Sequence, residues 1–161
     1  MSESWQITQI GTVRSPYRDP GTTPVQSTFS KGQGTLELLP EFTPGLSGID
    51  TFTHLILLTR MHQAPAEQLS ETPMVDGGES HGIFATRHMS RPNRIGLSIV
   101  RLLARKENIL IIEGLDLLDG TPVLDIKPYI PAFDSIPEAS SGWLTAQHIQ
   151  NIKTRSQTLS A

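Results

Sequence analysis

The chain has 161 residues, a net charge of −3 at pH 7 and no cysteine. Its length fits one domain with a real core, and the missing cysteines exclude disulfides, thiolate metal sites and cysteine nucleophiles. The N-terminal stretch MSESWQITQIG lacks the apolar core of a secretory signal, and the runs HLILL and NILII are too short to cross a bilayer, so we expect a cytoplasmic protein without a membrane segment.

The first half of the chain predicts three strands separated by shaped loops. Residues 5–14 are rich in β-forming residues and alternate in polarity, which indicates a strand. A loop with three prolines covers residues 15–27, and residues 33–40 predict a second strand. A tight turn over residues 42–50 precedes residues 53–63, whose apolar start is typical of a buried central strand.

The second half continues with short strands. Residues 64–81 are polar and predict an irregular loop, and residues 82–86 (GIFAT) predict a short strand. Residues 95–104 and 108–113 flank a turn and predict a β-hairpin. After the turn signal DGTP, residues 121–126 predict a further strand.

The chain changes character after residue 139. Residues 140–155 begin with a candidate serine cap and carry apolar residues at Trp143, Leu144, Ile149 and Ile152, which predicts an amphipathic helix. Many short strands and one clear helix, with 13 glycines and 12 prolines, favour a mainly β fold with a closed or nearly closed barrel. We expect a β-barrel domain over residues 1–139 and a C-terminal helix and tail over residues 140–161. No G-x-G-x-x-G motif follows the first strand, so a Rossmann cofactor site is unsupported.

The charges are sorted into two blocks. Between residues 82 and 105 the chain has no acid, and its arginines are Arg87, Arg91, Arg94, Arg101 and Arg105. Arginine suits the oxygens of phosphate and carboxylate groups, so this block is compatible with a phosphate-contacting face. The alternative is a solvated surface, or a structural turn whose arginines pair with the acids that follow.

The second block contains Asp116, Asp119 and Asp125. A carboxylate can accept hydrogen bonds from ribose hydroxyls and attract a cationic group such as a sulfonium. A calcium loop does not fit, because Leu117 and Leu118 stand where oxygen ligands would be needed. The histidines form no H-E-x-x-H pattern, so no metal is expected. Asp119 has an alternative interpretation as the residue that starts an Asp-Gly turn.

Four stretches together carry a resemblance. IGTVRSPY, FTHLILLTRMHQ, GIFATRHMSRPNRIGLS and DLLDGTPVLDIKPYIP occur in this order between about residues 7 and 131, and the chain resembles the TrmO family, also called TsaA-like or YaeB-like. The resemblance implies a single-sheeted β-barrel, a homodimer and the cofactor S-adenosyl-L-methionine. It also implies N6-methylation of threonylcarbamoyladenosine next to the anticodon of tRNA.

The resemblance also implies site residues by motif position. The implied cofactor contacts are Pro24, Val25, Gln26, His62, Gln63, Arg87, Leu97, Gly114, Leu115, Asp116, Leu117, Leu118 and Asp119. The candidate tRNA contacts are Arg14, Arg91, Asn93, Arg94 and Lys127. Methyl transfer depends mainly on in-line placement of the two reactants, and the residue that accepts a proton is left open among Asp125, Lys127 and Tyr129.

Two alternatives remain at this point. A methyltransferase with the same barrel could act on a small molecule or a protein, an option motivated by the negative net charge and by the absence of the extra C-terminal domain that many bacterial members carry. A non-enzymatic module that binds S-adenosyl-L-methionine is the other alternative.

Overall fold

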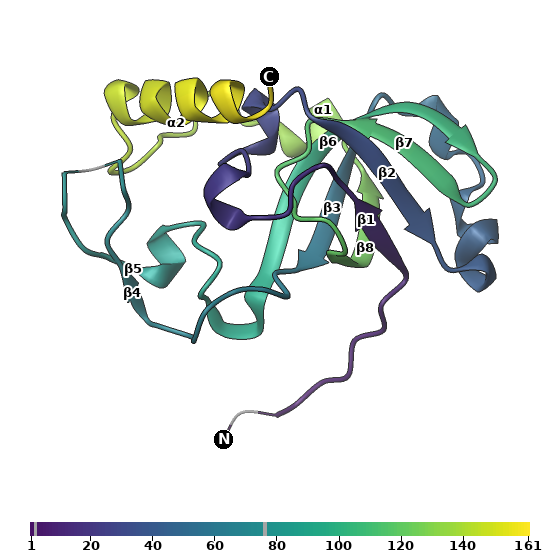
Figure 1. Cartoon of the computed structure of the whole chain (residues 1–161), viewed down its shortest axis with the longest axis horizontal. Helices are drawn as coiled ribbons and strands as arrows, with labels where there is room; N and C mark the ends of the chain where they lie inside the picture. Colours follow the sequence, from purple (N-terminus) through teal and green to yellow (C-terminus); the bar gives the residue numbers. More distant parts are fainter. Residues whose placement is uncertain (2, 76) are drawn as a thin grey trace.

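The computed structural model describes residues 1, 3–75 and 77–161 (Figure 1). In this part of the chain, six antiparallel strands close into one barrel in the order β1–β2–β7–β6–β3–β8. The strands are β1 (Gly11–Arg14), β2 (Gln33–Leu38), β3 (His54–Arg60), β6 (Ile95–Lys106), β7 (Ile109–Glu113) and β8 (Pro122–Pro128). The predicted fold class, a mainly β, single-sheeted barrel with short helices and a C-terminal helix, is therefore confirmed.

The barrel interior is filled by the inward-facing residues of each strand. In β3, Leu55, Leu57 and Thr59 are fully buried, whereas Ile56 and Leu58 between them are only half-buried. This alternation is the rule for barrel strands, whose side chains point in and out in turn. Consequently β3 presents a partly exposed apolar row on the outer surface of the barrel.

The first predicted strand is longer in the sequence pattern than in the structure. β1 begins at Gly11, and the earlier residues Trp5 and Ile7 are 82% and 58% exposed. Gly11 allows β1 to approach β2 closely, because a Cβ atom there would lie 2.6 Å from the Glu37 carbonyl oxygen. Alternating polarity upstream of this contact does not create a strand without a partner to pair with.

The strand predicted over residues 82–86 is wrong for most of its length. β5 (His81–Gly82) pairs with β4 (Ser70–Glu71) in a separate two-stranded sheet, and the chain then turns into η5 (Ile83–Ala85). The Thr86 hydroxyl donates to the Ile83 carbonyl and accepts from the backbone N–H of His88. These local bonds favour a turn over a continued strand.

The C-terminal helix is present but begins later than the pattern suggests. α2 (Ala146–Leu159) is capped by Thr145, whose hydroxyl accepts from the His148 N–H, so the predicted serine cap is wrong and Trp143 precedes the helix. The remaining helices are short: η1 (Pro20–Thr22), η2 (Ser27–Phe29), η3 (Pro40–Leu46), η4 (Ile49–Thr51), η6 (Pro92–Arg94) and α1 (Pro131–Asp134). None of the described helices is both long and apolar enough to span a membrane.

The topology gathers three connections at one end of the barrel. Because neighbouring strands are antiparallel, β1, β3 and β7 end where β2, β6 and β8 begin. The β1–β2, β3–β6 and β7–β8 connections therefore meet at this end, which we call the loop end, and α2 lies alongside the β1–β2 connection (Figure 1). Most of the residues expected to bind a cofactor are on these three connections.

Candidate active site

The centre of the candidate site is the carboxylate of Asp116 on the β7–β8 connection. One of its oxygens accepts the backbone N–H of Ser27 at 2.9 Å, and the other accepts the Ser98 hydroxyl at 2.5 Å. The Ser27 hydroxyl in turn accepts the backbone N–H of Ile99 on β6 at 3.1 Å. These bonds fix the β1–β2 connection against β6 and the β7–β8 connection.

Arg87 reaches the same place from the β3–β6 connection. Its Nη1 donates to the side-chain oxygen of Gln26 at 3.3 Å, and its positive charge is close enough to lower the pKa of Asp116. Arg87 itself is exposed. The structure therefore brings Gln26, Arg87 and Asp116, which lie far apart in the sequence, into one site.

The charged form of Asp116 is destabilised at this site. Burial raises its pKa to about 6, although the hydrogen bonds from Ser98 and Ser27 and the charge of Arg87 act in the opposite direction. Part of its surface is still accessible to solvent. A carboxylate that is poorly solvated in its charged form is stabilised when a cationic group approaches it.

An exposed apolar surface lies on the outer face of β6, the strand whose inward-facing Ser98 bonds to Asp116. Leu97 on β6 is 50% exposed and points outward from the barrel, on the same face as Ile99. In the strand register Leu97 pairs with Leu58, and Leu58 pairs with Asp125 of β8. An apolar wall next to a few polar groups is the usual composition of a site for a nucleoside.

The β7–β8 connection uses its other leucines differently from Asp116. Leu115 and Leu117 are buried in the barrel core, and Leu118 packs against it. Gly114 takes a positive φ of 92°, a conformation that favours glycine. From this segment, therefore, the structure places the side chain of Asp116 beside η2 of the β1–β2 connection.

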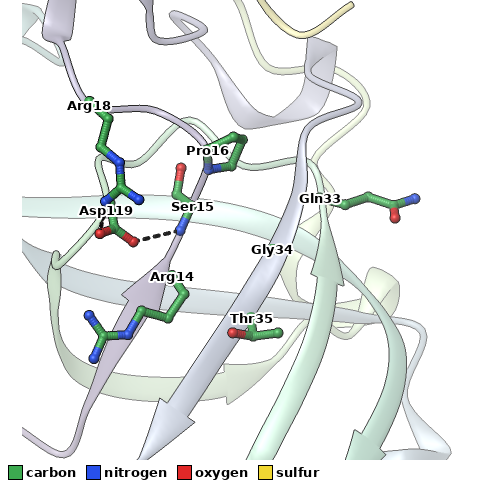
Figure 2. Close-up of a pocket in the computed structure, with 8 residues that line it drawn as sticks. All are labelled: Arg14, Ser15, Pro16, Arg18, Gln33, Gly34, Thr35 and Asp119. Carbon is green, nitrogen blue, oxygen red and sulfur yellow. Dashed lines mark hydrogen bonds and ion pairs between the residues drawn. The ribbon is translucent and has the colours of Figure 1, made fainter.

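Asp119 lies in a separate hollow, shown in Figure 2. Its carboxylate accepts the backbone N–H of Ser15 at 3.0 Å and forms an ion pair with Arg18. The Ser15 hydrogen bond is the main cause of a lowered pKa for Asp119, and Arg18 adds to it. The hollow is lined by Arg14, Ser15, Pro16, Arg18, Gln33, Gly34, Thr35 and Asp119. Asp119 thus holds the end of β1 against the turn that starts β8.

His62 and Gln63 follow β3 at the loop end. Their side chains contact each other, with 3.4 Å between the Gln63 amide nitrogen and His62 Nε2. The residue before them, Met61, donates its N–H to the Arg94 carbonyl at 2.8 Å. No hydrogen bond in the described part of the chain joins this pair to Arg87 or Asp116.

The turn over residues 91–94, which leads into β6, is held by bonds and backbone angles of its own residues. Arg91 Nη1 donates to the Thr86 carbonyl at 2.9 Å. Asn93 and Arg94 both have positive φ, 63° and 51°, which is rare for residues with a side chain and turns the chain sharply into β6. Of the expected tRNA contacts, Arg91 therefore also has a structural bond within its loop.

The three candidates for a proton acceptor lie along β8. Asp125 and Lys127 form an ion pair of 2.9 Å on the outer face of the strand. Tyr129 follows the strand, and its N–H donates to the His54 carbonyl at the end of the barrel opposite the loop end. Among the described residues no group of three or more acidic or histidine side chains could hold a metal ion.

Comparison with known proteins identifies the family of the chain. Residues 12–135 match the model of the tRNA-methyltransferase O N-terminal domain. The chain belongs to this family. It is 48% identical over 136 residues to a Pyrococcus abyssi protein described as a probable S-adenosyl-L-methionine-binding protein, covering 84% of this chain and 73% of that one.

A second relative and a solved structure extend the comparison. The chain is 39% identical over 150 residues to the tRNA (adenine(37)-N6)-methyltransferase of Escherichia coli, covering 87% of this chain and 64% of that protein. A crystal structure of TrmO from Pseudomonas aeruginosa superposes with a TM-score of 0.74 at 40% identity, covering 87% of this chain and 62% of that one. The chain thus spans less than two thirds of these two TrmO proteins.

One contact beside the candidate site was not predicted from the sequence. The backbone N–H groups of Val25 and Gln26 both donate to the hydroxyl of Ser156 on α2, at 3.1 and 3.2 Å. Ser156 is fully buried, and Pro24 beside this pair is buried too. A serine inside a polar helix carries no signal of such a bond, because the same residue is normally solvent-exposed. Ser156 also lies outside the residues that match the family domain.

Proposed function

We propose that the protein is an S-adenosyl-L-methionine-dependent methyltransferase that modifies the N6 atom of an adenosine in tRNA, as the name of its Escherichia coli relative describes. The observation that carries this proposal is the convergence of Gln26, Arg87 and Asp116 at the loop end of the barrel. The threonylcarbamoyl form of the adenosine next to the anticodon is the substrate that the family resemblance implies.

The cofactor fits the chemistry of these side chains. S-adenosyl-L-methionine supplies a methyl group activated by its positively charged sulfur. Asp116, whose charge is poorly solvated, would attract the cationic part of the molecule, and Arg87 would bind its carboxylate. Leu97 offers an exposed apolar contact for the adenine ring. We assign Gln26 to holding Arg87 in place through their hydrogen bond.

The protein's part in methyl transfer is mainly positioning, because the activated methyl group needs an aligned nucleophile rather than acid catalysis. The accepting nitrogen must still lose a proton. Of the three candidates, Asp125 is the one that shares a strand register with Leu58 and Leu97, and we therefore favour it over Lys127 and Tyr129. Asp125 also forms an ion pair of 2.9 Å with Lys127 on the same face of β8.

For the tRNA itself we propose contacts from arginines around the loop end. Arg14 lines the hollow of Figure 2, and its pairing with Glu37 leaves most of its side chain exposed. Arg91, Asn93 and Arg94 form the sharp turn before β6. Basic groups of this kind bind phosphates and release counterions, so tRNA affinity should fall steeply with salt. A tRNA substrate would also place the protein in the cytoplasm.

We further propose a homodimer formed through the outer face of β6 and β3. Apart from Leu97, which we assign to the adenine contact, this face carries Ile95, 38% exposed on β6, and the half-buried Ile56 and Leu58 of β3. Exposed apolar rows on neighbouring strands are typical of surfaces that pair with another subunit. Light scattering of wild-type protein and of Ile95→Glu tests this assembly, and a monomeric wild type would disprove it.

The test of the function measures cofactor binding and tRNA methylation in the same preparation. Wild-type protein should bind S-adenosyl-L-methionine by calorimetry and transfer a labelled methyl group to tRNA that carries the modified adenosine. Arg87→Ala should weaken cofactor binding about tenfold or more, since a charge-assisted bond is worth roughly 1.5–3 kcal/mol.

The matched control is Arg101→Ala. It removes the same charge from a surface ion pair with Glu113 on the barrel wall, so cofactor affinity should not change. Equal affinity of the Arg87→Ala variant and the wild type would refute the assigned site.

A second candidate function is binding of the cofactor without catalysis, which the name of the Pyrococcus relative motivates. Tight cofactor binding with no methyl transfer to tRNA, to small molecules or to proteins of an extract would favour it. Methyl transfer to a small molecule or a protein, with tRNA inert, would instead identify a different acceptor for the same barrel.

A further inference from the structure

The C-terminal segment touches both of the chain segments that meet at the candidate cofactor site. On one side Ser156 accepts the N–H groups of Val25 and Gln26 with a single, fully buried hydroxyl. Further along the same connection, the Ser160 hydroxyl accepts the N–H of Lys31 at 3.1 Å. The end of α2 is therefore bonded to both ends of the part of the β1–β2 connection that includes η2.

On the other side the residues before α2 hold the segment that leads to Arg87. The indole N–H of Trp143 donates to the Ala85 carbonyl at 2.8 Å. Its ring stacks on His81, with centroids 4.0 Å apart and planes 13° from parallel. In Figure 1 the yellow helix α2 extends from the neighbourhood of β4 and β5 to the β1–β2 connection. It thus spans the two segments whose side chains, Gln26 and Arg87, bond to each other.

We propose that the segment from Trp143 to Ser160 is a clamp that positions the cofactor-binding loops, and that Ser156 is its positioning residue. This inference rests on the proposed function. The clamp lies outside residues 12–135, the part that matches the family domain. This chain therefore completes its cofactor site with residues that the family domain does not contain.

The physical role of Ser156 follows from what it accepts. Two consecutive N–H groups that point at one hydroxyl fix the peptide planes on both sides of Val25. Fixing these planes sets the direction in which the Gln26 side chain leaves the backbone, and Gln26 in turn bonds to Arg87 at 3.3 Å. Binding a ligand to loops that are already ordered avoids the entropy cost of ordering them. Ser156 would thus act on cofactor affinity through Gln26 and Arg87, and not by touching the cofactor.

The experiment compares Ser156→Ala with Thr158→Ala in the full chain. Thr158 lies on the exposed side of α2, and its hydroxyl bonds within the helix to the Thr154 carbonyl. Ser156→Ala should raise the KM for S-adenosyl-L-methionine and its calorimetric Kd about tenfold with kcat unchanged, because the loop must then be ordered on binding. Thr158→Ala should leave both constants at the wild-type value.

Amide signals give a readout that does not depend on activity. In Ser156→Ala the N–H groups of Val25 and Gln26 should exchange with solvent at least about tenfold faster, while amides of the barrel strands keep their wild-type rates. Unchanged exchange and unchanged Kd would overturn the clamp. If Ser156→Ala does not fold, Trp143→Phe replaces it: the stack on His81 is kept, the bond to Ala85 is lost, and the Kd should rise about threefold.

The proposed function and the clamp can be refuted separately. A wild-type protein that does not bind S-adenosyl-L-methionine refutes the proposed function, and with it the role of the clamp. A wild-type protein that binds the cofactor and is sensitive to Arg87→Ala, but whose Ser156→Ala variant keeps the wild-type Kd, refutes the clamp alone.

Discussion

Asp116 and Asp119 stand three residues apart on the same connection and have opposite electrostatics. Asp116 is largely enclosed by protein, and burial raises its pKa to about 6. Asp119 accepts the Ser15 N–H and faces Arg18 on the surface, and its pKa is lowered. The surroundings, and not the residue type, therefore decide which of the two carboxylates is stabilised in its charged form.

This contrast separates a structural acid from a functional candidate. The carboxylate of Asp119 is already paired with the Ser15 N–H and with Arg18, so it stabilises the turn between β7 and β8. A carboxylate that is paired in this way attracts a cationic ligand only weakly. The charge of Asp116 is only partly compensated by Ser27, Ser98 and Arg87. A protein keeps a carboxylate in such a place at a cost in stability, which is common where the group serves binding or catalysis.

The largest effect is expected for Asp116→Asn. The amide has the same shape but cannot attract a cation, so the affinity for S-adenosyl-L-methionine should fall roughly 10- to 100-fold, the value of one charge-assisted contact. The unfolding free energy at pH 7.5 should fall by no more than about 1 kcal/mol, because the variant no longer buries a charge. Calorimetry and urea unfolding measure the two quantities. Loss of stability together with unchanged affinity would assign Asp116 to structure alone.

The pH dependence of Asp116 should have opposite signs for stability and binding. Because its folded pKa of about 6 lies above the ordinary value of 3.8, the folded state binds the extra proton. The stability that this group contributes is therefore present below pH 4 and is lost as the pH rises to about 6, by at most about 3 kcal/mol. Affinity for the cationic cofactor should instead increase over the same range, as the carboxylate becomes charged.

Subtracting the values for Asp116→Asn at each pH isolates this group from the other titrating residues. Urea unfolding and calorimetry at several pH values between 4 and 8 supply the two curves. Two curves that rise together, or a flat binding curve, would contradict the charged contact.

Ser98→Ala tests the same acid with a smaller expected effect. The Ser98 hydroxyl bonds to Asp116 at 2.5 Å and lowers its pKa, so removing the hydroxyl should raise that pKa further. The midpoint of cofactor binding against pH should then move upward, while affinity well above the midpoint changes less than threefold or so. Thr12→Ala, on β1 and without a contact to Asp116, is the control, because it also removes one hydroxyl from a barrel strand. A midpoint that stays in place would show that Asp116 is not the titrating group.

The parts of the fold that the sequence predicted are those with a local pattern. The hairpin of β6 and β7 and the buried strand β3 follow from apolar runs and a turn signal, and all three are present. Where a distant partner decides, the pattern fails: the residues around Trp5 alternate in polarity but have no strand beside them. The 82–86 stretch fails for a local reason, because bonds of the Thr86 hydroxyl favour a turn there. Barrel closure itself came from the resemblance and the number of short strands.

Part of the candidate site could be predicted, but from family motifs and not from local sequence patterns. Family motifs placed Gln26, Arg87 and Asp116 in one site, and the structure brings them together, although no property of the isolated segments says that three connections meet at one end of a barrel. The same motif segment includes Asp119, which the structure places in a separate hollow. The bond of Ser156 to Val25 could not be predicted, because it joins residues more than a hundred positions apart in the sequence.

The smallest effect is expected for Asp119→Asn, and it completes the contrast with Asp116. Because the pKa of Asp119 is lowered in the folded protein, its contribution to stability is present above the ordinary value near 4 and is lost as the pH falls below it. The pair with Arg18 is on the surface, so the difference in unfolding free energy from wild type at pH 7 should stay under about 1 kcal/mol. Cofactor affinity should not change at any pH. Urea unfolding at pH 7 and pH 3, with calorimetry at pH 7, checks these outcomes. A tenfold loss of affinity in this variant would mean that the hollow of Figure 2 belongs to the cofactor site after all, and that the two acids act together.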